Sequence, residues 1–128
     1  MREYIKMVEE FHIAFDQKDA KIPTVGSIKQ GELRYSLLSE ETGEYIEAVR
    51  ESNIVDIADA LGDQLYIIYG TILKHGLQNK IEKVFKEIHR SNMSKLGPDG
   101  KPIYREDGKI LKGPEYFKPN IKKILDQP

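Results

Sequence analysis

The sequence predicts an all-α protein, a four-helix bundle that carries a small C-terminal β-hairpin. Apolar residues recur at helical spacing in four segments, and turn-forming residues separate each segment from the next. The pattern changes after Gly97, where two short β-capable runs flank Asp107-Gly108. A chain of 128 residues is long enough for one core, so we expect residues 1–128 to form a single domain.

The first helix is predicted over residues 2–17. Its apolar positions are Tyr4, Val8, Phe11 and Phe15. His12 lies next to this stripe, and we expect it to pack or cap rather than to bind a metal. Residues 18–31 contain one proline and two glycines that break the helical period, so they are predicted to form a loop.

The second and third helices are predicted over about 33–50 and 54–74, with Ser52 and Asn53 in the turn between them. The third is apolar around most of its circumference, which is typical of a central buried helix. Gly76 follows it as a left-handed cap.

The fourth helix is predicted to start at Asn79. Its apolar stripe, which we expect to be buried, is Ile81, Val84, Phe85 and Ile88. Continued to the helix end, this stripe puts Asn92 and Lys95 on the inward side, towards the interior that the acidic residues described below also face.

The hairpin is predicted at about 99–113, and a short helical piece at 121–125 ends the chain. Its basic residues are Lys101, Arg105, Lys109 and Lys112. They either attract phosphates or keep two exposed edge strands soluble.

Composition excludes several classes of protein. With 20 basic and 21 acidic residues, the chain is not expected to bind a nucleic acid polymer or a membrane surface. The absence of cysteine rules out disulfides, a thiol nucleophile and thiolate metal sites. The charged N-terminus does not resemble a signal peptide, and no apolar run reaches membrane-spanning length, so we expect a cytoplasmic protein.

Two groups of carboxylates lie within the second and third predicted helices. They are Glu40, Glu41 and Glu44, and then Asp56, Asp59 and Asp63. Helical geometry places Glu41 in the middle of an apolar stripe, whereas Glu47 and Glu51 are typical of a solvated face. If the two helices pack together, five or six carboxylates meet, which is costly for ionised groups removed from water. Arg34 and Arg50 are the nearest basic residues, and neither is expected to face the centre. A hard divalent ion such as Mg²⁺ would offset the charge.

These acids also carry a family resemblance. Glu40-Glu41-x-x-Glu44 and the later Leu61-Gly62-Asp63 resemble the EExxE and ExxD motifs of the all-α nucleoside triphosphate pyrophosphohydrolases, the superfamily of MazG and phosphoribosyl-ATP pyrophosphohydrolase. LRYSLLSEETGEYIEA, DALGDQLYIIYGTILKHG, EIHRSNMSKL and DGKPIYREDGKILKGPEYF are all similar to the phosphoribosyl-ATP pyrophosphohydrolase-like subgroup. The resemblance covers most of residues 11–118.

The resemblance implies hydrolysis of a nucleoside triphosphate between its α and β phosphates, with Mg²⁺ held by the helical carboxylates. Mn²⁺ is a possible substitute. The chain departs from the motif at Ala60, where the superfamily has glutamate. Asp59 and Asp56 are the candidates to replace that glutamate, and Asp59 shares a face with Asp63 because the two are four residues apart.

We therefore expect four metal ligands, Glu41, Glu44, Asp59 and Asp63. Glu40, at the edge of the stripe, is the candidate to deprotonate the attacking water. Lys95 is expected to contact phosphate, Asn92 a base or sugar edge, and Tyr66 to stack or pack, with helix-end capping as the alternative for Asn92 and Lys95.

Two other functions remain open at this stage. One is a non-catalytic helical module, regulatory or oligomeric, with a structural metal site. The other is a phosphoribosyl-ATP pyrophosphohydrolase proper, although the N-terminal segment and the hairpin are extra to that small module. The apolar residues left over by a small bundle, together with the resemblance, predict a homodimer or homotetramer.

Overall fold

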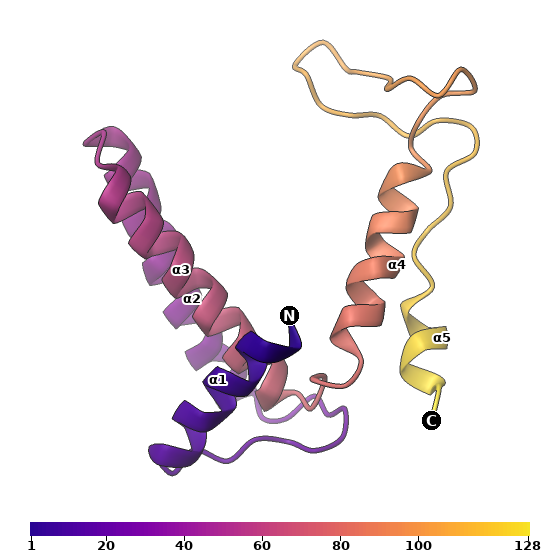
Figure 1. Ribbon diagram of the computed structural model, residues 1–128. Coiled ribbons are helices and arrows are strands. Elements are labelled where there is room, and N and C mark those ends of the chain that lie inside the picture. Colours follow the sequence, from indigo (N-terminus) through magenta and orange to yellow (C-terminus); the bar gives the residue numbers. More distant parts are fainter. The chain divides into compact units, whose positions relative to one another are not determined.

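The computed structural model describes residues 1–128 and confirms the all-α class (Figure 1). Its helices are α1 (Arg2–Ala14), α2 (Ile28–Arg50), α3 (Ile54–Lys74), α4 (Ile81–Met93) and α5 (Ile121–Asp126). The chain divides into two compact units, Met1–Asn79 and Lys80–Pro128. Each unit is described by itself below.

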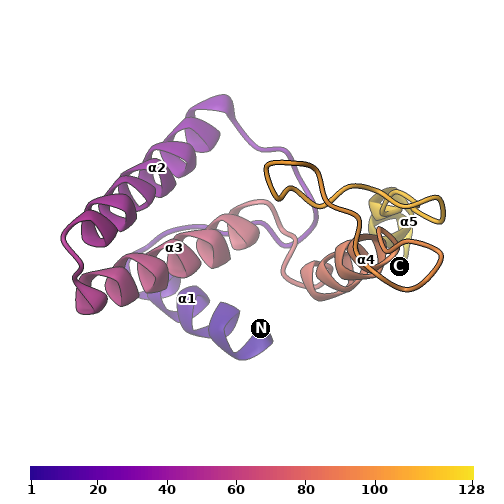
Figure 2. The same cartoon turned by 90° about the horizontal axis from the view of Figure 1, so that it is seen from above.

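In the first unit, α2 and α3 form an antiparallel pair joined by three residues (Figures 1 and 2). So short a connection between two long helices favours antiparallel neighbours. Ser52 turns the chain with a positive φ of 54°, and the side chain of Asn53 accepts a hydrogen bond from the N–H of Asp56. This cap fixes the start of α3, and the bounds of α3 agree with the sequence prediction.

The other helix bounds differ from the predictions by a few residues. α2 begins at Ile28 rather than at about 33, because Ser27 Oγ accepts a hydrogen bond from the N–H of Gln30. That cap outweighs Gly31, whose cost inside a helix is about 1 kcal/mol. α1 ends at Ala14 because the backbone of Asp16 adopts a positive φ of 56°. α4 begins at Ile81 rather than at Asn79.

α1 packs against α3 through aromatic side chains. The rings of Tyr4 and Tyr69 stack with centroids 6.4 Å apart, and Phe11 meets Tyr66 edge-on at 5.7 Å. Ile5 and Val8 are buried in this contact region of the unit. Aromatic pairs in these geometries add stabilisation beyond the apolar area that they bury.

The loop after α1 closes the C-terminal end of α3. The N–H of Ala20 donates to the carbonyl of Leu73, and the N–H of Thr24 donates to that of His75. Gly76 has a φ of +67°, as predicted for a left-handed cap, and a Cβ there would lie 2.0 Å from the carbonyl oxygen of Ile22. The carbonyls of Leu73 and His75 thus accept hydrogen bonds from the loop, and only glycine fits where the loop passes position 76.

The buried core is small. Its apolar members are Ile5, Val8, Ala48, Ala60, Ile72 and Leu73. α3 does contact both α1 and α2, as a central helix should, but Ile54, Val55 and Leu65 on it are largely exposed. The sequence prediction of a helix buried on nearly all sides is therefore wrong for the single chain. None of the five helices is both long and apolar enough to cross a membrane.

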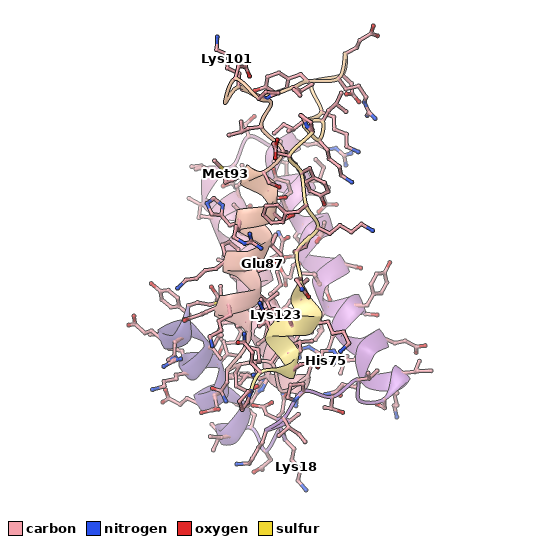
Figure 3. All side chains as sticks on the ribbon, turned by 90° about the vertical axis from the view of Figure 1, so that its right-hand side faces the viewer. Lys18, His75, Glu87, Met93, Lys101 and Lys123 are labelled. Atoms are coloured by element: carbon pink, nitrogen blue, oxygen red, sulfur yellow. The ribbon has the colours of Figure 1, made fainter.

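In the second unit, Glu87 joins α4 to the start of α5. The N–H of Asn120 donates to Glu87 Oε2 at 2.7 Å, and Arg90 Nε donates to Glu87 Oε1 at 2.8 Å. Glu87 on α4 and Lys123 on α5 are labelled in Figure 3. The hydrogen bonds from Arg90 and Asn120, and the charges of Arg90 and Lys123, lower the pKa of Glu87.

The predicted hairpin at 99–113 is not confirmed as a two-stranded element. The structure has one antiparallel bridge, between Tyr104 and Ile110, and no strand. The N–H of Arg105 donates to the carbonyl of Lys109, and Gly108 has a φ of +87°. The turn at Asp107-Gly108 is therefore present, but too few ladder hydrogen bonds form beyond it to make β-strands.

Candidate functional site

Five of the predicted acids come together where α2 packs on α3. They are Glu40, Glu41 and Glu44 on α2, and Asp59 and Asp63 on α3. Residues three or four apart share a face of a helix, so each helix presents two acids, Glu41 with Glu44 and Asp59 with Asp63, from one face. Glu40 acts electrostatically on Glu41 from the adjacent position.

The cluster raises the pKa of Glu41 to about 7. Burial is the largest cause, followed by a hydrogen bond with Glu44 and then by the charges of Glu44, Asp63 and Glu40. Glu41 Oε2 is buried and has no hydrogen-bond partner. A carboxylate oxygen that is removed from water and has no donor is costly, so a positive group placed at this point would stabilise the site.

Asp63 shows the same effect from the other helix. Burial raises its pKa first, and the charges of Asp59 and Glu44 raise it further. No lysine, arginine or histidine forms an ion pair with any of the five acids. The negative charge along the contact between α2 and α3, called the seam below, is therefore not neutralised by the protein itself.

An acid-lined hollow of about 220 Å³ continues the cluster towards the turn between α2 and α3. Its lining residues are Glu44, Glu47, Ala48, Glu51, Asp56 and Asp59. The sequence pattern of Glu47 and Glu51 is typical of a solvated face, and both are exposed, but they also border this hollow. The antiparallel register of the two helices is the signal that could have placed them opposite Asp56.

The donor set fits a hard divalent ion. It consists of carboxylate oxygens alone, the preferred ligands of Mg²⁺ and Mn²⁺, and it includes the orphaned oxygen of Glu41. In this structure, no three His, Asp or Glu side chains lie close enough together to bind one metal ion. Glu44 and Asp59 are exposed, which leaves their side chains free to reorient.

Of the three predicted substrate-binding residues, Tyr66 follows Asp63 by three residues on α3, whereas Asn92 and Lys95 are distant from the acids in sequence. Tyr66 on α3 packs on Phe11 and lines an apolar groove of about 380 Å³ with Tyr4, Met7, Val8, Gly62, Leu65 and Tyr69. Asn92 is exposed on α4, and Lys95 follows that helix. Asn92 and Lys95 belong to the second unit, so their approach to the acids stays a prediction.

Comparison with known proteins identifies the family of the chain. The family model described as phosphoribosyl-ATP pyrophosphohydrolase matches residues 8–92, a range that contains all five acids. The chain belongs to this family. It thereby falls in the all-α NTP pyrophosphohydrolase superfamily, as the EExxE resemblance predicted.

Two relatives extend this result. An uncharacterized protein of Acanthamoeba polyphaga mimivirus is 30% identical over 97 residues, which are 74% of this chain and 35% of the viral protein. The chain thus spans about a third of the length of that relative. The crystal structure of a proposed NTP pyrophosphohydrolase from Exiguobacterium sp. 255-15 is similar with a TM-score of 0.54 and 27% identity, over 95% of this chain and 93% of that one.

Proposed function

We propose that the protein hydrolyses a nucleoside triphosphate, a deoxy or non-standard one included, to the monophosphate and pyrophosphate in the presence of Mg²⁺. One observation carries the proposal. A chain of the pyrophosphohydrolase family gathers five acids at a helix seam, with a buried carboxylate oxygen that no protein group satisfies. A divalent ion would satisfy that oxygen and offset the negative charge of the acids and of the triphosphate.

Glu41, Glu44, Asp59 and Asp63 would hold Mg²⁺, with Mn²⁺ as a substitute. When bound, the ion would offset the charge of the triphosphate and lower the pKa of a bound water. Glu40 accepts the proton of the attacking water in this proposal. It is exposed at the edge of the cluster, where solvent reaches its carboxylate, and it is adjacent to Glu41.

The remaining substrate contacts are proposed on the second unit and on α3. Lys95 supplies a positive charge for phosphate, and Asn92 has both a donor and an acceptor for a base or sugar edge. Tyr66 lines the apolar groove beside Gly62, which precedes Asp63 in the chain. A base stacked in that groove would lie near the acids.

Two alternatives remain as proposals. The description of the matching family favours phosphoribosyl-ATP as a second candidate substrate. A non-catalytic module with a structural metal site would use the same carboxylates without turnover.

We also propose a homodimer or homotetramer. Large apolar side chains such as Ile54, Val55 and Leu65 are exposed on α3, and an assembly would bury them. Sedimentation that finds only a monomer of 14.7 kDa would refute this part of the proposal.

The deciding experiment measures pyrophosphate release from a panel of ribo- and deoxyribonucleoside triphosphates and phosphoribosyl-ATP. Each substrate is assayed with Mg²⁺, with Mn²⁺ and with EDTA. The matched variants are Glu41→Gln, which we expect to be inactive, and Glu32→Gln, which removes an exposed carboxylate from the same helix and should keep full activity. Metal binding without release from any substrate would favour the non-catalytic module.

A further inference from the structure

Arg34 joins α2 to α3 through two hydrogen bonds. Its Nε donates to Thr71 Oγ1 at 2.9 Å, and its Nη2 donates to the backbone carbonyl of Ile67 at 2.9 Å. Thr71 Oγ1 in turn donates to the same carbonyl at 2.8 Å. The planar guanidinium thus reaches one side-chain and one backbone acceptor on the neighbouring helix, which sets direction as well as distance.

Gly70 makes room for this guanidinium. A Cβ at position 70 would lie 2.6 Å from Arg34 Nη2 and 3.2 Å from His12 Nε2. Glycine inside a helix costs about 1 kcal/mol relative to alanine, and the presence of Gly70 in the C-terminal part of α3 has a steric reason here. The guanidinium and the His12 ring both lie over the bare backbone of α3.

His12 is itself held in place. Its ring is buried, and Nδ1 makes a hydrogen bond of 2.6 Å with Asp19 Oδ1. Asp19 Oδ1 also lies 3.6 Å from Lys74 Nζ. α1, the loop after it, α2 and α3 therefore meet around Arg34 and Gly70, and no acid of the cluster takes part.

The Arg34 contacts and the acids lie along the same seam. Glu41 follows Arg34 by seven residues on α2, and Asp63 precedes Ile67 by four residues on α3. Seven residues are about two helical turns, or roughly 10 Å along the axis, so Arg34 and Glu41 share one face of α2. The alignment of α2 on α3 at Arg34 determines which residues meet at Glu41.

The acids oppose this alignment. Glu41, Glu44, Asp59 and Asp63 repel one another across the seam, and the apolar residues buried there are as small as Ala48 and Ala60. The turn at residues 51–53 connects one end of the helix pair. Arg34 connects the other end, beyond the acids.

We propose that Arg34 is a positioning residue that fixes the register and separation of α2 and α3, so that Glu41 faces Asp63 before any ion or substrate binds. The expected effect of Arg34 on metal binding rests on the proposed function. The effect of Arg34 on the helix positions does not, because its hydrogen bonds are made within the protein alone.

The test uses a distance measured without metal. The chain has no cysteine, so Ser36→Cys with Ala58→Cys, exposed positions on α2 and α3, can carry two nitroxide labels. Pulsed electron resonance then reports the separation of the helices. In this background we compare Arg34→Met, Arg34→Lys and Lys29→Met, the last of which removes an exposed charge from the same end of α2.

Arg34→Met should lengthen or broaden the distance distribution and weaken Mn²⁺ binding, followed by calorimetry, by tenfold or more. Lys29→Met should leave both unchanged. Arg34→Lys keeps the charge but cannot reproduce the planar geometry of the guanidinium, so its distance distribution and Mn²⁺ affinity should lie between those of the unaltered protein and Arg34→Met. It replaces Arg34→Met in the test if that variant does not fold. Adding Glu41→Gln to Arg34→Met should narrow the distribution again, because it removes part of the repulsion that Arg34 opposes.

An unchanged distribution in Arg34→Met overturns the proposal, as does a broadened one that Glu41→Gln fails to narrow. These outcomes are separate from those of the enzyme assay. If the distances change as expected but no triphosphate is hydrolysed by the unaltered protein, the positioning role stands and the proposed activity fails.

Discussion

The carboxyl of Glu41 shares a hydrogen bond with the carboxyl of Glu44, its neighbour on the same face of α2. Burial is the main reason why the pKa of Glu41 rises to about 7, and this bond, which needs a proton between the two acids, is the next largest. A divalent ion would displace that proton. Stability, metal binding and activity are therefore expected to respond together to changes at this pair.

The first prediction concerns pH. Because the folded protein holds the Glu41 proton up to about pH 7 while the unfolded chain releases it near 4.5, the folded state binds more protons between these values. The stabilisation is complete below pH 4.5 and is lost as the pH rises to about 7. Thermal melts in EDTA from pH 4.5 to 8 should show this loss. Glu41→Gln should flatten the profile, whereas Glu32→Gln should not.

The second prediction concerns charge removal in the cluster. Glu41→Gln or Glu44→Gln should abolish Mg²⁺-dependent activity and leave the fold intact, or more stable without metal, because each deletes one charge from a repulsive group. Calorimetric melts should show a smaller stabilisation by added Mg²⁺ than in the unaltered protein. Unchanged turnover in both variants would exclude the proposed site.

The third prediction compares two glycines of α3. Gly70→Ala should displace the Arg34 guanidinium and destabilise the protein by about 1–3 kcal/mol, because lost charged hydrogen bonds exceed the gain in helix propensity. Gly62→Ala meets nothing within 4 Å and should stabilise by up to about 1 kcal/mol. Denaturant unfolding measures both changes. An equal change in the free energy of unfolding for both variants would show that the Arg34 guanidinium does not depend on the space at Gly70.

Local signals accounted for much of this structure. The period of apolar residues and the turn at Ser52-Asn53 predicted α3 to the residue, and the EExxE spacing predicted that Glu41 and Glu44 share a face. The start of α2 was missed because a single cap at Ser27 outweighed Gly31. The pattern of apolar residues cannot show which of two small local energies, the cap at Ser27 or the cost of Gly31, is the larger.

The contacts across the seam were harder to predict. As predicted, Arg34 does not face the centre of the acidic cluster. Its hydrogen bonds to Ile67 and Thr71 could not be predicted, because they depend on the register of α2 against α3 and on the space at Gly70. The acid-lined hollow at Glu47 and Glu51 depends on the same register. Neither is visible in one helix taken alone.

The last prediction addresses the departure from the superfamily motif at Ala60. Asp59 raises the pKa of Asp63 through its charge, whereas Asp56 accepts a hydrogen bond from Asn53 Nδ2 at 2.9 Å at the start of α3. Asp59 is therefore the better replacement for the missing glutamate, and Asp56 is engaged at the cap. Asp59→Ala should abolish metal-dependent hydrolysis, and Asp56→Ala should reduce it much less.

The double variant Asp59→Ala with Ala60→Glu restores the superfamily spacing and should recover part of the activity. Because Ala60 is buried, its control is Ala60→Glu alone, which reports any cost of placing the larger side chain there. Pyrophosphate release and Mn²⁺ affinity are measured for all four variants. If Asp59→Ala keeps full activity while Asp56→Ala is inactive, the ion binds one turn closer to the N-terminus of α3, in the hollow bordered by Glu47 and Glu51.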